Sequence, residues 1–356
     1  MQDSESQQFY YFFTAMINSQ LADETAREND KYGNNGLAII ALVLSLIAYA
    51  FVPLLIRWSQ VEISPESTMF NRFWIAGLMI VCGQGLQKIK QILTNQQPAE
   101  NVIIQKSVAI APTLDYQLLF LWIITATTST IVPVLWAWSL QQTSIANSAL
   151  IHNLTPLFTT VLGWLLFKTQ FNRRFILGTV TAVGGTVALS INDFQLDISK
   201  IQGDALALAS AIFWTVSLLG MERLRDKFSS SFIQLWLCLV GMVLTMLMTL
   251  ALGEQFFPSS LQGWLAVVSL AIVGQILGDG LITYSLSYFS ASFVALVFLL
   301  DPVLTAIAAW FAFGETLNLA NAIAFAIILF GVYCGITATQ AKTDPDPPAN
   351  LIDINQ

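Results

Sequence analysis

Residues 139–172 read SLQQTSIANSALIHNLTPLFTTVLGWLLFKTQFN, and residues 285–318 read SLSYFSASFVALVFLLDPVLTAIAAWFAFGETLN. The two stretches align without a gap, and eleven of their 34 positions are identical. Apolar composition alone would give a few matches, but a shared proline and tryptophan at the same spacing (Pro156 and Trp164, Pro302 and Trp310) are harder to obtain that way. The chain therefore carries an internal duplication.

The composition places this duplication in a membrane. Of the 356 residues, 55% are hydrophobic and 10% are charged, against about 45–50% and about 25% in an ordinary soluble domain. So few charges cannot cover a water-soluble enzyme, a nucleic-acid-binding protein or a disulfide scaffold, and the net charge of −7 separately disfavours nucleic acid. The three cysteines lie in apolar runs, and one histidine cannot form a histidine-rich metal site. We predict an integral membrane protein without cofactor or metal.

The apolar runs predict the fold. A helix needs about 20 mostly apolar residues to cross the hydrocarbon layer, whereas transmembrane β-strands would be about ten residues long and alternating, which these runs are not. Ten segments qualify: 36–57, 68–88, 117–139, 144–167, 174–191, 203–223, 231–253, 262–284, 290–313 and 319–338. We predict an all-α protein with ten transmembrane helices in two inverted five-helix repeats. The predicted parts are a polar segment (1–35), the first repeat (36–191), a linker (192–202), the second repeat (203–338) and a disordered tail (339–356).

The basic residues predict how the helices are oriented. If both termini and the loops after every second helix share one side, that side holds 12 of the 15 lysines and arginines, which marks it as cytoplasmic. Because five is an odd number, the second repeat then crosses the membrane upside down. Inverted repeats are typical of secondary transporters, in which two halves expose one central site alternately; an old duplication kept for packing is the alternative. We expect the plasma (inner) membrane as the location.

The repeated motifs resemble a known family. "NLTPLFTTVLGWLLF" (153–167), "LLDPVLTAIAAWFAFGETLN" (299–318) and "LLIRWSQVEISPESTMFNRFWIAGLMI" (54–80) are similar to motifs of the EamA-type branch of the drug/metabolite transporter superfamily. The resemblance covers residues 36–338, nearly all of the membrane part. It implies ten helices in two inverted halves around a central substrate cavity, and secondary transport of small metabolites, often efflux.

Carboxylates at membrane depth are the first site candidates, because an ionisable group in lipid requires a partner, a cavity or a function. Asp301 precedes the helix-breaking Pro302 and could exchange a proton in a cavity; a kink residue bonded to polar neighbours is the equal alternative. Asp279 lies between two glycines and one turn from Gln275. We expect it to line the cavity, with a structural polar contact as the alternative.

Other polar and aromatic residues complete the candidates. Arg72, next to Asn71, either holds an anionic substrate group or extends to the lipid headgroups. Only a few residues separate it from the start of the predicted helix at 68–88, which favours the headgroups. His152 and Asn153 lie just before Pro156, where we expect a break in the helix. The histidine is either a proton relay or a neutral contact between helices. The aromatic residues expected to form cavity walls are Trp214 and Tyr284.

These features favour a secondary transporter that exports small amphipathic metabolites such as amino acids, with a proton as the candidate coupling ion. Import and antiport by the same machinery are the alternatives. The sequence has no Walker-type phosphate-binding motif for ATP. A membrane-embedded enzyme would need a converged nucleophile and base, which one histidine and scattered acids do not supply. A receptor or scaffold would carry no flux, and the sequence leaves the oligomeric state open.

Overall fold

The structure is a computed structural model that describes residues 35–93, 116–190, 200–304 and 319–338. Every regular element in these ranges is a helix. The predicted polar segment at 1–35, most of the linker and the C-terminal tail lie outside the described residues, as does the second half of the predicted helix at 290–313.

The described helices follow the apolar runs of the sequence closely. Their bounds are α2 Asn35–Ser59, α3 Pro65–Leu93, α4 Tyr116–Gln142, α5 Ile145–His152, α6 Thr155–Phe167, α7 Arg173–Ser190, α8 Ile201–Arg225, α9 Ser230–Leu252, α10 Leu261–Leu270, η4 Ala271–Asp279, α11 Gly280–Ser285, α12 Ala291–Phe298 and α14 Leu319–Ala338. Seven helical stretches among the described residues are long and apolar enough to cross a membrane, and a shorter apolar helix covers Ala291–Leu304. The chain is thus an integral multi-pass membrane protein, and the count of ten spans stays a prediction.

The sequence repeat reappears as a repeat of local structure. α5 begins after Ser144, whose side chain accepts the Asn147 N–H at 3.0 Å. α12 begins after Ser290, whose side chain accepts the Phe293 N–H at 3.3 Å. Such serine caps satisfy N–H groups that the helix leaves unpaired. Each helix then ends in a turn shortly before the shared proline, at residues 153–154 and 299–300.

Corresponding helices of the two repeats pack against each other in opposite directions. Where α7 meets α14, Gly178 lies against Gly335, and Gly185 lies against Ile328. A Cβ atom on Gly178 would come within 2.6 Å of the Gly331 carbonyl oxygen, so only glycine permits this approach. Since rising numbers on α7 meet falling numbers on α14, the two helices are antiparallel.

The same relation holds for α3 and α9. Phe73 of α3 lies against Gly241 of α9, and Gly77 lies against Cys238, so this pair is antiparallel as well. α7 and α14 occupy corresponding places in the two repeats, as do α3 and α9. In both cases one copy therefore points opposite to the other.

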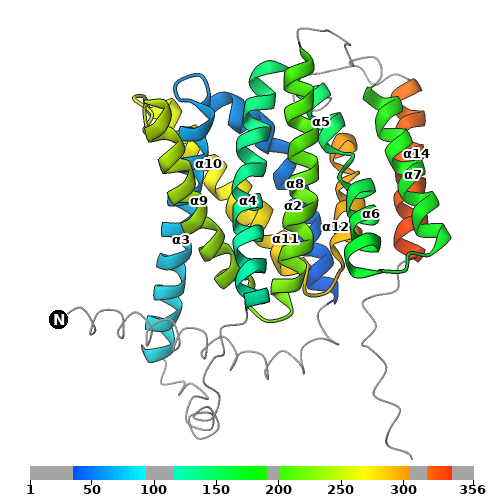
Figure 1. The fold of residues 1–356 in the computed structure, drawn as a ribbon, viewed down its shortest axis with the longest axis horizontal. Helices are drawn as coiled ribbons and strands as arrows, with labels where there is room; N and C mark the ends of the chain where they lie inside the picture. Colours follow the sequence, from blue (N-terminus) through cyan, green and yellow to red (C-terminus); the bar gives the residue numbers. More distant parts are fainter. Residues whose placement is uncertain (1–34, 94–115, 191–199, 305–318, 339–356) are drawn as a thin grey trace, which may run out of the picture.

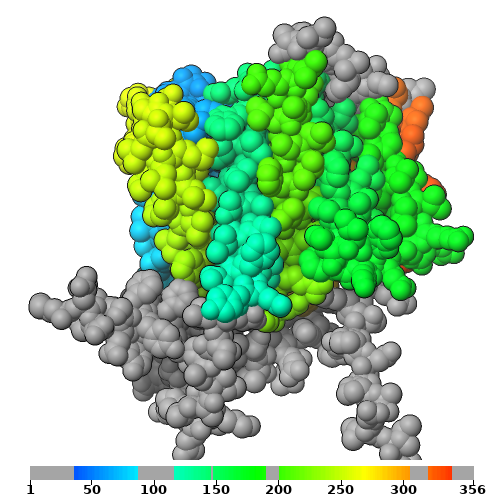
Figure 2. Space-filling view, in the orientation of Figure 1, coloured from blue at the N-terminus to red at the C-terminus, as the bar shows by residue number. Residues whose placement is uncertain are grey.

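The remaining large contacts join α4 to α8 and α2 to the α10–η4–α11 stretch. Figure 1 shows α3, α9 and α10 on the left side of the bundle and α7 with α14 on the right side, with α4 and α8 between them. In the same view, α9, α4, α8 and the α6–α7 region form one continuous face (Figure 2). Large apolar side chains are exposed on these helices, among them Phe120 on α4 and Leu247 on α9, as contact with lipid requires.

Candidate functional site

A small cavity lies inside the bundle. Its volume is about 30 Å³, which holds about two water molecules at about 10–15 Å³ each. The lining side chains come from α2, α3, α9 and η4 on one wall and from α4, α5 and α8 on the other. They are Tyr49, Arg72, Phe73, Ser129, Val132, Pro133, Trp136, His152, Trp214, Ser217, Met221, Gln234, Leu237, Gln275 and Asp279.

An ion pair dominates the first wall. Arg72 Nη2 of α3 lies 2.8 Å from Asp279 Oδ2 at the end of η4. The arginine side chain is 2% exposed and the aspartate side chain 20% exposed. The pair joins the first repeat to the second, and each charge compensates the other inside the bundle. This corrects the expectation for Arg72, which lies in the interior rather than at the headgroups because α3 begins at Pro65 and places it two turns inside the helix.

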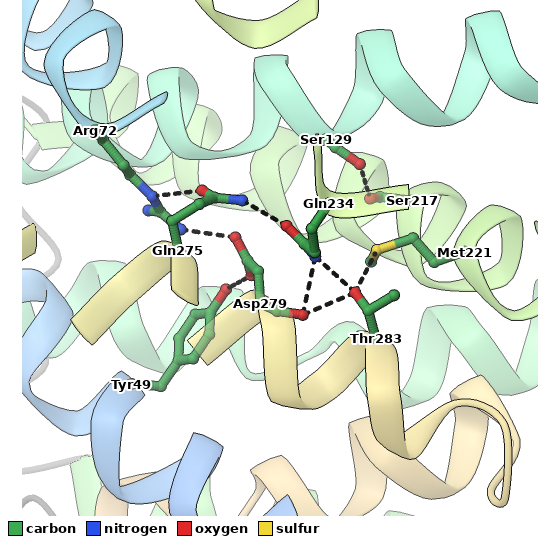
Figure 3. Close-up of polar contacts among 9 residues, drawn as sticks. All are labelled: Tyr49, Arg72, Ser129, Ser217, Met221, Gln234, Gln275, Asp279 and Thr283. Carbon is green, nitrogen blue, oxygen red and sulfur yellow. Dashed lines mark hydrogen bonds and ion pairs between the residues drawn. The ribbon is translucent and has the colours of Figure 1, made fainter. Parts of the chain in front are cut away.

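Uncharged side chains extend the ion pair into a network (Figure 3). Arg72 Nε donates to Gln275 Oε1 at 2.9 Å, and Gln275 Nε2 donates to Gln234 Oε1 at 2.9 Å. Tyr49 OH donates to the second carboxylate oxygen of Asp279. The ion pair thus lies in a network of side chains from α2, α3, α9 and η4.

The side-chain NH₂ group of Gln234 also has hydrogen-bond partners. Its Nε2 donates to the Asp279 carbonyl oxygen at 3.0 Å and to Thr283 Oγ1 at 2.6 Å. The Thr283 hydroxyl donates to the same carbonyl at 2.7 Å and lies 3.5 Å from the Met221 sulfur. The carbonyl of Asp279, where the π-helix ends, therefore has two side-chain donors.

The sequence around η4 explains how Arg72 and Tyr49 reach this helix. η4 is a π-helix, a geometry that often occurs at functional sites. A Cβ on Gly274 would lie 3.3 Å from Arg72 Cζ, and a Cβ on Gly278 would lie 2.8 Å from the Tyr49 ring. The two glycines give the side chains of α2 and α3 the space to lie against the helix backbone.

Stacked rings form the opposite wall. The imidazole of His152 lies between the indoles of Trp136 and Trp214, with centroid distances of 5.0 Å on both sides and interplanar angles of 13° and 23°. Trp214 also stacks on Tyr49 at 6.1 Å and meets the edge of Phe298 at 5.6 Å. A row of four rings thus runs from Trp136 to the tyrosine that bonds Asp279.

Polar groups on this second wall are few. Ser210 Oγ lies 3.1 Å from His152 Nδ1, and Ser129 Oγ lies 2.5 Å from Ser217 Oγ between α4 and α8. Among the residues that the structure describes, the buried Trp136 Nε1 has no hydrogen-bond partner. The cavity accordingly has one charged and amide-lined wall and one aromatic wall.

One end of the bundle is joined across the repeats by hydrogen bonds. Glu62, in the α2–α3 connection, accepts the backbone N–H groups of Ser259 and Ser260 at 3.1 Å each and the Ser260 hydroxyl. These bonds, led by that from the Ser260 side chain, lower the pKa of Glu62. Beside them, Asn71 Nδ2 donates to the Phe256 carbonyl at 2.7 Å.

The structure brings several of the predicted residues together and separates others. Arg72, Gln275, Asp279, His152 and Trp214 all line the cavity.

Four predicted residues are placed elsewhere. Tyr284 does not line this cavity, against the expectation, because its hydroxyl points to Tyr288 at 3.5 Å. Asn71 bonds the α9–α10 connection, and Asn153 ends α5. Asp301 is outside the cavity lining, and its buried Oδ1 has no partner within the described part of the chain.

The cavity residues that were not predicted from the sequence include Tyr49, Gln234 and Trp136. Tyr49 and Gln234 could have been found as polar groups within apolar runs, the same signal that singled out Asp279. Trp136 offers no such signal, because a tryptophan near a helix end is equally typical of the membrane interface.

Comparison with known proteins agrees with this architecture. Residues 36–191 and 201–337 each match the EamA-like transporter family. A protein of Methanothermobacter thermautotrophicus named "Uncharacterized transporter" is 29% identical over 224 residues, which are 62% of this chain and 64% of that relative, slightly less than two thirds of its length. A protein of Archaeoglobus fulgidus with the same name is 22% identical over 305 residues, 84% of this chain and 97% of the relative.

A solved structure supports the fold. A chain titled "Crystal structure of protein" has a TM-score of 0.65 with 19% identity, and the match covers 85% of this chain and 99% of that one. Because the family match extends over both repeats, the chain belongs to the EamA-like transporter family.

Proposed function

We propose that the protein is a secondary transporter in which ten helices, arranged as two inverted five-helix repeats, expose the central cavity alternately to the two sides of the membrane. The observation that carries this proposal is the antiparallel packing of α3 on α9 and of α7 on α14. Copies that point in opposite directions give a carrier two nearly equivalent arrangements, one open to each side.

The walls of the cavity support an amphipathic substrate. The wall with Arg72, Asp279 and Gln275 can hold carboxylate, ammonium or amide groups, and the wall with Trp136 and Trp214 can hold an apolar part. Small metabolites such as amino acids combine both features. The cavity of about 30 Å³ is smaller than such a molecule, so binding requires the two walls to move apart.

We propose export because the family that the motifs resemble often performs efflux, and the basic residues set the orientation of the chain in the membrane. With the positive side inside, both termini are cytoplasmic and the Glu62 end of the bundle faces outward. The hydrogen bonds from Ser259 and Ser260 to Glu62 then close the outer end in this structure. Asp301 is the candidate proton carrier, because its Oδ1 is buried without a partner among the described residues.

The test is counterflow in proteoliposomes. Vesicles loaded with an unlabelled amino acid accumulate the same radiolabelled amino acid when a carrier exchanges the two, and each standard amino acid is assayed in turn. Trp214→Ala should reduce counterflow about tenfold or more by removing the aromatic wall, whereas Trp164→Ala, at an exposed position on α6, should leave it unchanged. Absence of counterflow for every amino acid, or equal loss in both variants, would contradict the proposal.

A further inference from the structure

The charges of the cavity cancel within one wall. Among the residues that the structure describes, Arg72 and Asp279 are the charged groups that line the cavity, and they form an ion pair at 2.8 Å. Tyr49 of α2 bonds the carboxylate and Gln275 of η4 bonds the guanidinium, and Gln234 of α9 bonds Gln275 in turn. Within the described residues, the hydrogen bonds to these two charges come from α2, α3 and η4, and none crosses to α4, α5 or α8.

The contacts between the two cavity walls decide how the walls can move apart. Tyr49 stacks on Trp214 of the opposite wall, and Thr283 lies 3.5 Å from the Met221 sulfur. Neither contact includes a charged group of the pair. The charged side chains that bond α4 from the first wall, Arg57 and Glu66, lie outside the cavity lining, so the walls can separate without breaking the ion pair. The empty site then carries no net charge in either arrangement.

We propose that the Arg72–Asp279 pair sets the charge selectivity of the carrier: the site admits molecules of zero net charge and excludes monovalent cations and anions of the same size. The inference rests on the proposed transport function. An uncompensated charge in the membrane interior is unfavourable, and the closed pair leaves no spare countercharge for an ion. A zwitterion, by contrast, can offer its carboxylate to Arg72 and its ammonium group to Asp279 and remain neutral in the bound state.

The pair also makes a prediction for the empty carrier. Because the empty site is neutral, it can change sides without substrate. Asp279→Asn leaves the charge of Arg72 uncompensated and should hinder this movement, and the double variant Arg72→Gln/Asp279→Asn should restore it.

Three probes of one shape and different charge test the selectivity. They are leucine (zwitterion), 3-methylbutylamine (cation) and 4-methylpentanoate (anion), each measured as uptake into proteoliposomes. The wild type should carry leucine about tenfold to a hundredfold faster than either ion. Asp279→Asn should turn the preference toward 4-methylpentanoate, and Arg72→Gln toward 3-methylbutylamine. Equal transport of the three probes by the wild type, or an unchanged order in both variants, would overturn the proposal.

A second measurement is independent of the substrate. Cys82, Cys238 and Cys334 are replaced by serine, and Ser129 of the cavity is replaced by cysteine. In empty vesicles, a membrane-impermeant thiol reagent should label this cysteine from both sides in the wild-type background and in the double variant. In Asp279→Asn, labelling should be confined mainly to one side.

The outcomes separate the two proposals. Wild-type labelling from one side alone, or two-sided labelling in Asp279→Asn equal to that of the wild type, would overturn the role of the ion pair while counterflow could still support transport. Absence of both labelling and counterflow would overturn the transport function itself.

Discussion

The ion pair between Arg72 and Asp279 predicts an asymmetric loss of stability. Asp279→Asn leaves the guanidinium, which is 2% exposed, without its countercharge. Breaking a buried ion pair in this way costs about 3–5 kcal/mol, and the amide oxygen that remains as an acceptor favours the lower figure. Arg72→Gln leaves a carboxylate that is 20% exposed and still bonded by Tyr49, so we expect a smaller loss of about 1–3 kcal/mol.

The double variant provides the control. With both charges removed, no buried charge is left unpaired, and the loss should be smaller than the sum of the single losses by about 2 kcal/mol or more. The free energy of unfolding is measured by SDS titration in mixed micelles for the wild type, both single variants and the double variant. Additive losses, or a larger loss for Arg72→Gln than for Asp279→Asn, would refute this account of the network.

Three further predictions concern other parts of the molecule. Gly178→Ala should lower the free energy of unfolding by about 1–3 kcal/mol because its Cβ would collide with the backbone of α14. Gly184→Ala, whose Cβ meets nothing within 4 Å, should be neutral. Equal melting temperatures of the two variants would contradict the close packing of α7 on α14. The pKa of Glu62 is lowered in the folded protein, so its contribution to stability is present above the unfolded pKa of 4.5 and is lost as the pH falls through the folded pKa. The melting temperature of the wild type should therefore fall more steeply in acid than that of Glu62→Gln. Parallel curves of melting temperature against pH would argue against the bonds from Ser259 and Ser260 to Glu62. Asp301→Asn should abolish uptake driven by a proton gradient while exchange persists, and unchanged driven uptake would remove Asp301 from the mechanism.

The helices were predictable from the sequence because lipid sets their length. Nine of the ten predicted runs are helical in the described residues, with ends that differ from the prediction by a few residues, and the run at 290–313 is described only to residue 304. The break before Pro156 followed from the missing N–H of proline. These are local properties, and the sequence contains them.

The ion pair was not predictable in the same way. Arg72 and Asp279 are 207 residues apart, and only the packing of α3 against η4 makes them partners. Asp279 and Gln275 were selected because polar groups in lipid require partners, but nothing local identifies which ones. The π-helix likewise has no sequence signal beyond the two glycines that the packing uses, Gly274 and Gly278.

The most direct test of the central claim is the orientation of two equivalent connections. Val61, between α2 and α3, is 80% exposed, and Lys227, between α8 and α9, is also exposed; the two occupy corresponding places in the repeats. In a cysteine-free background, Val61→Cys and Lys227→Cys are labelled with an impermeant thiol reagent in sealed vesicles of known orientation. Inverted repeats require labelling from opposite sides of the membrane, with Lys227→Cys on the cytoplasmic side. Labelling of both from one side would contradict the inverted arrangement and the alternating access built on it.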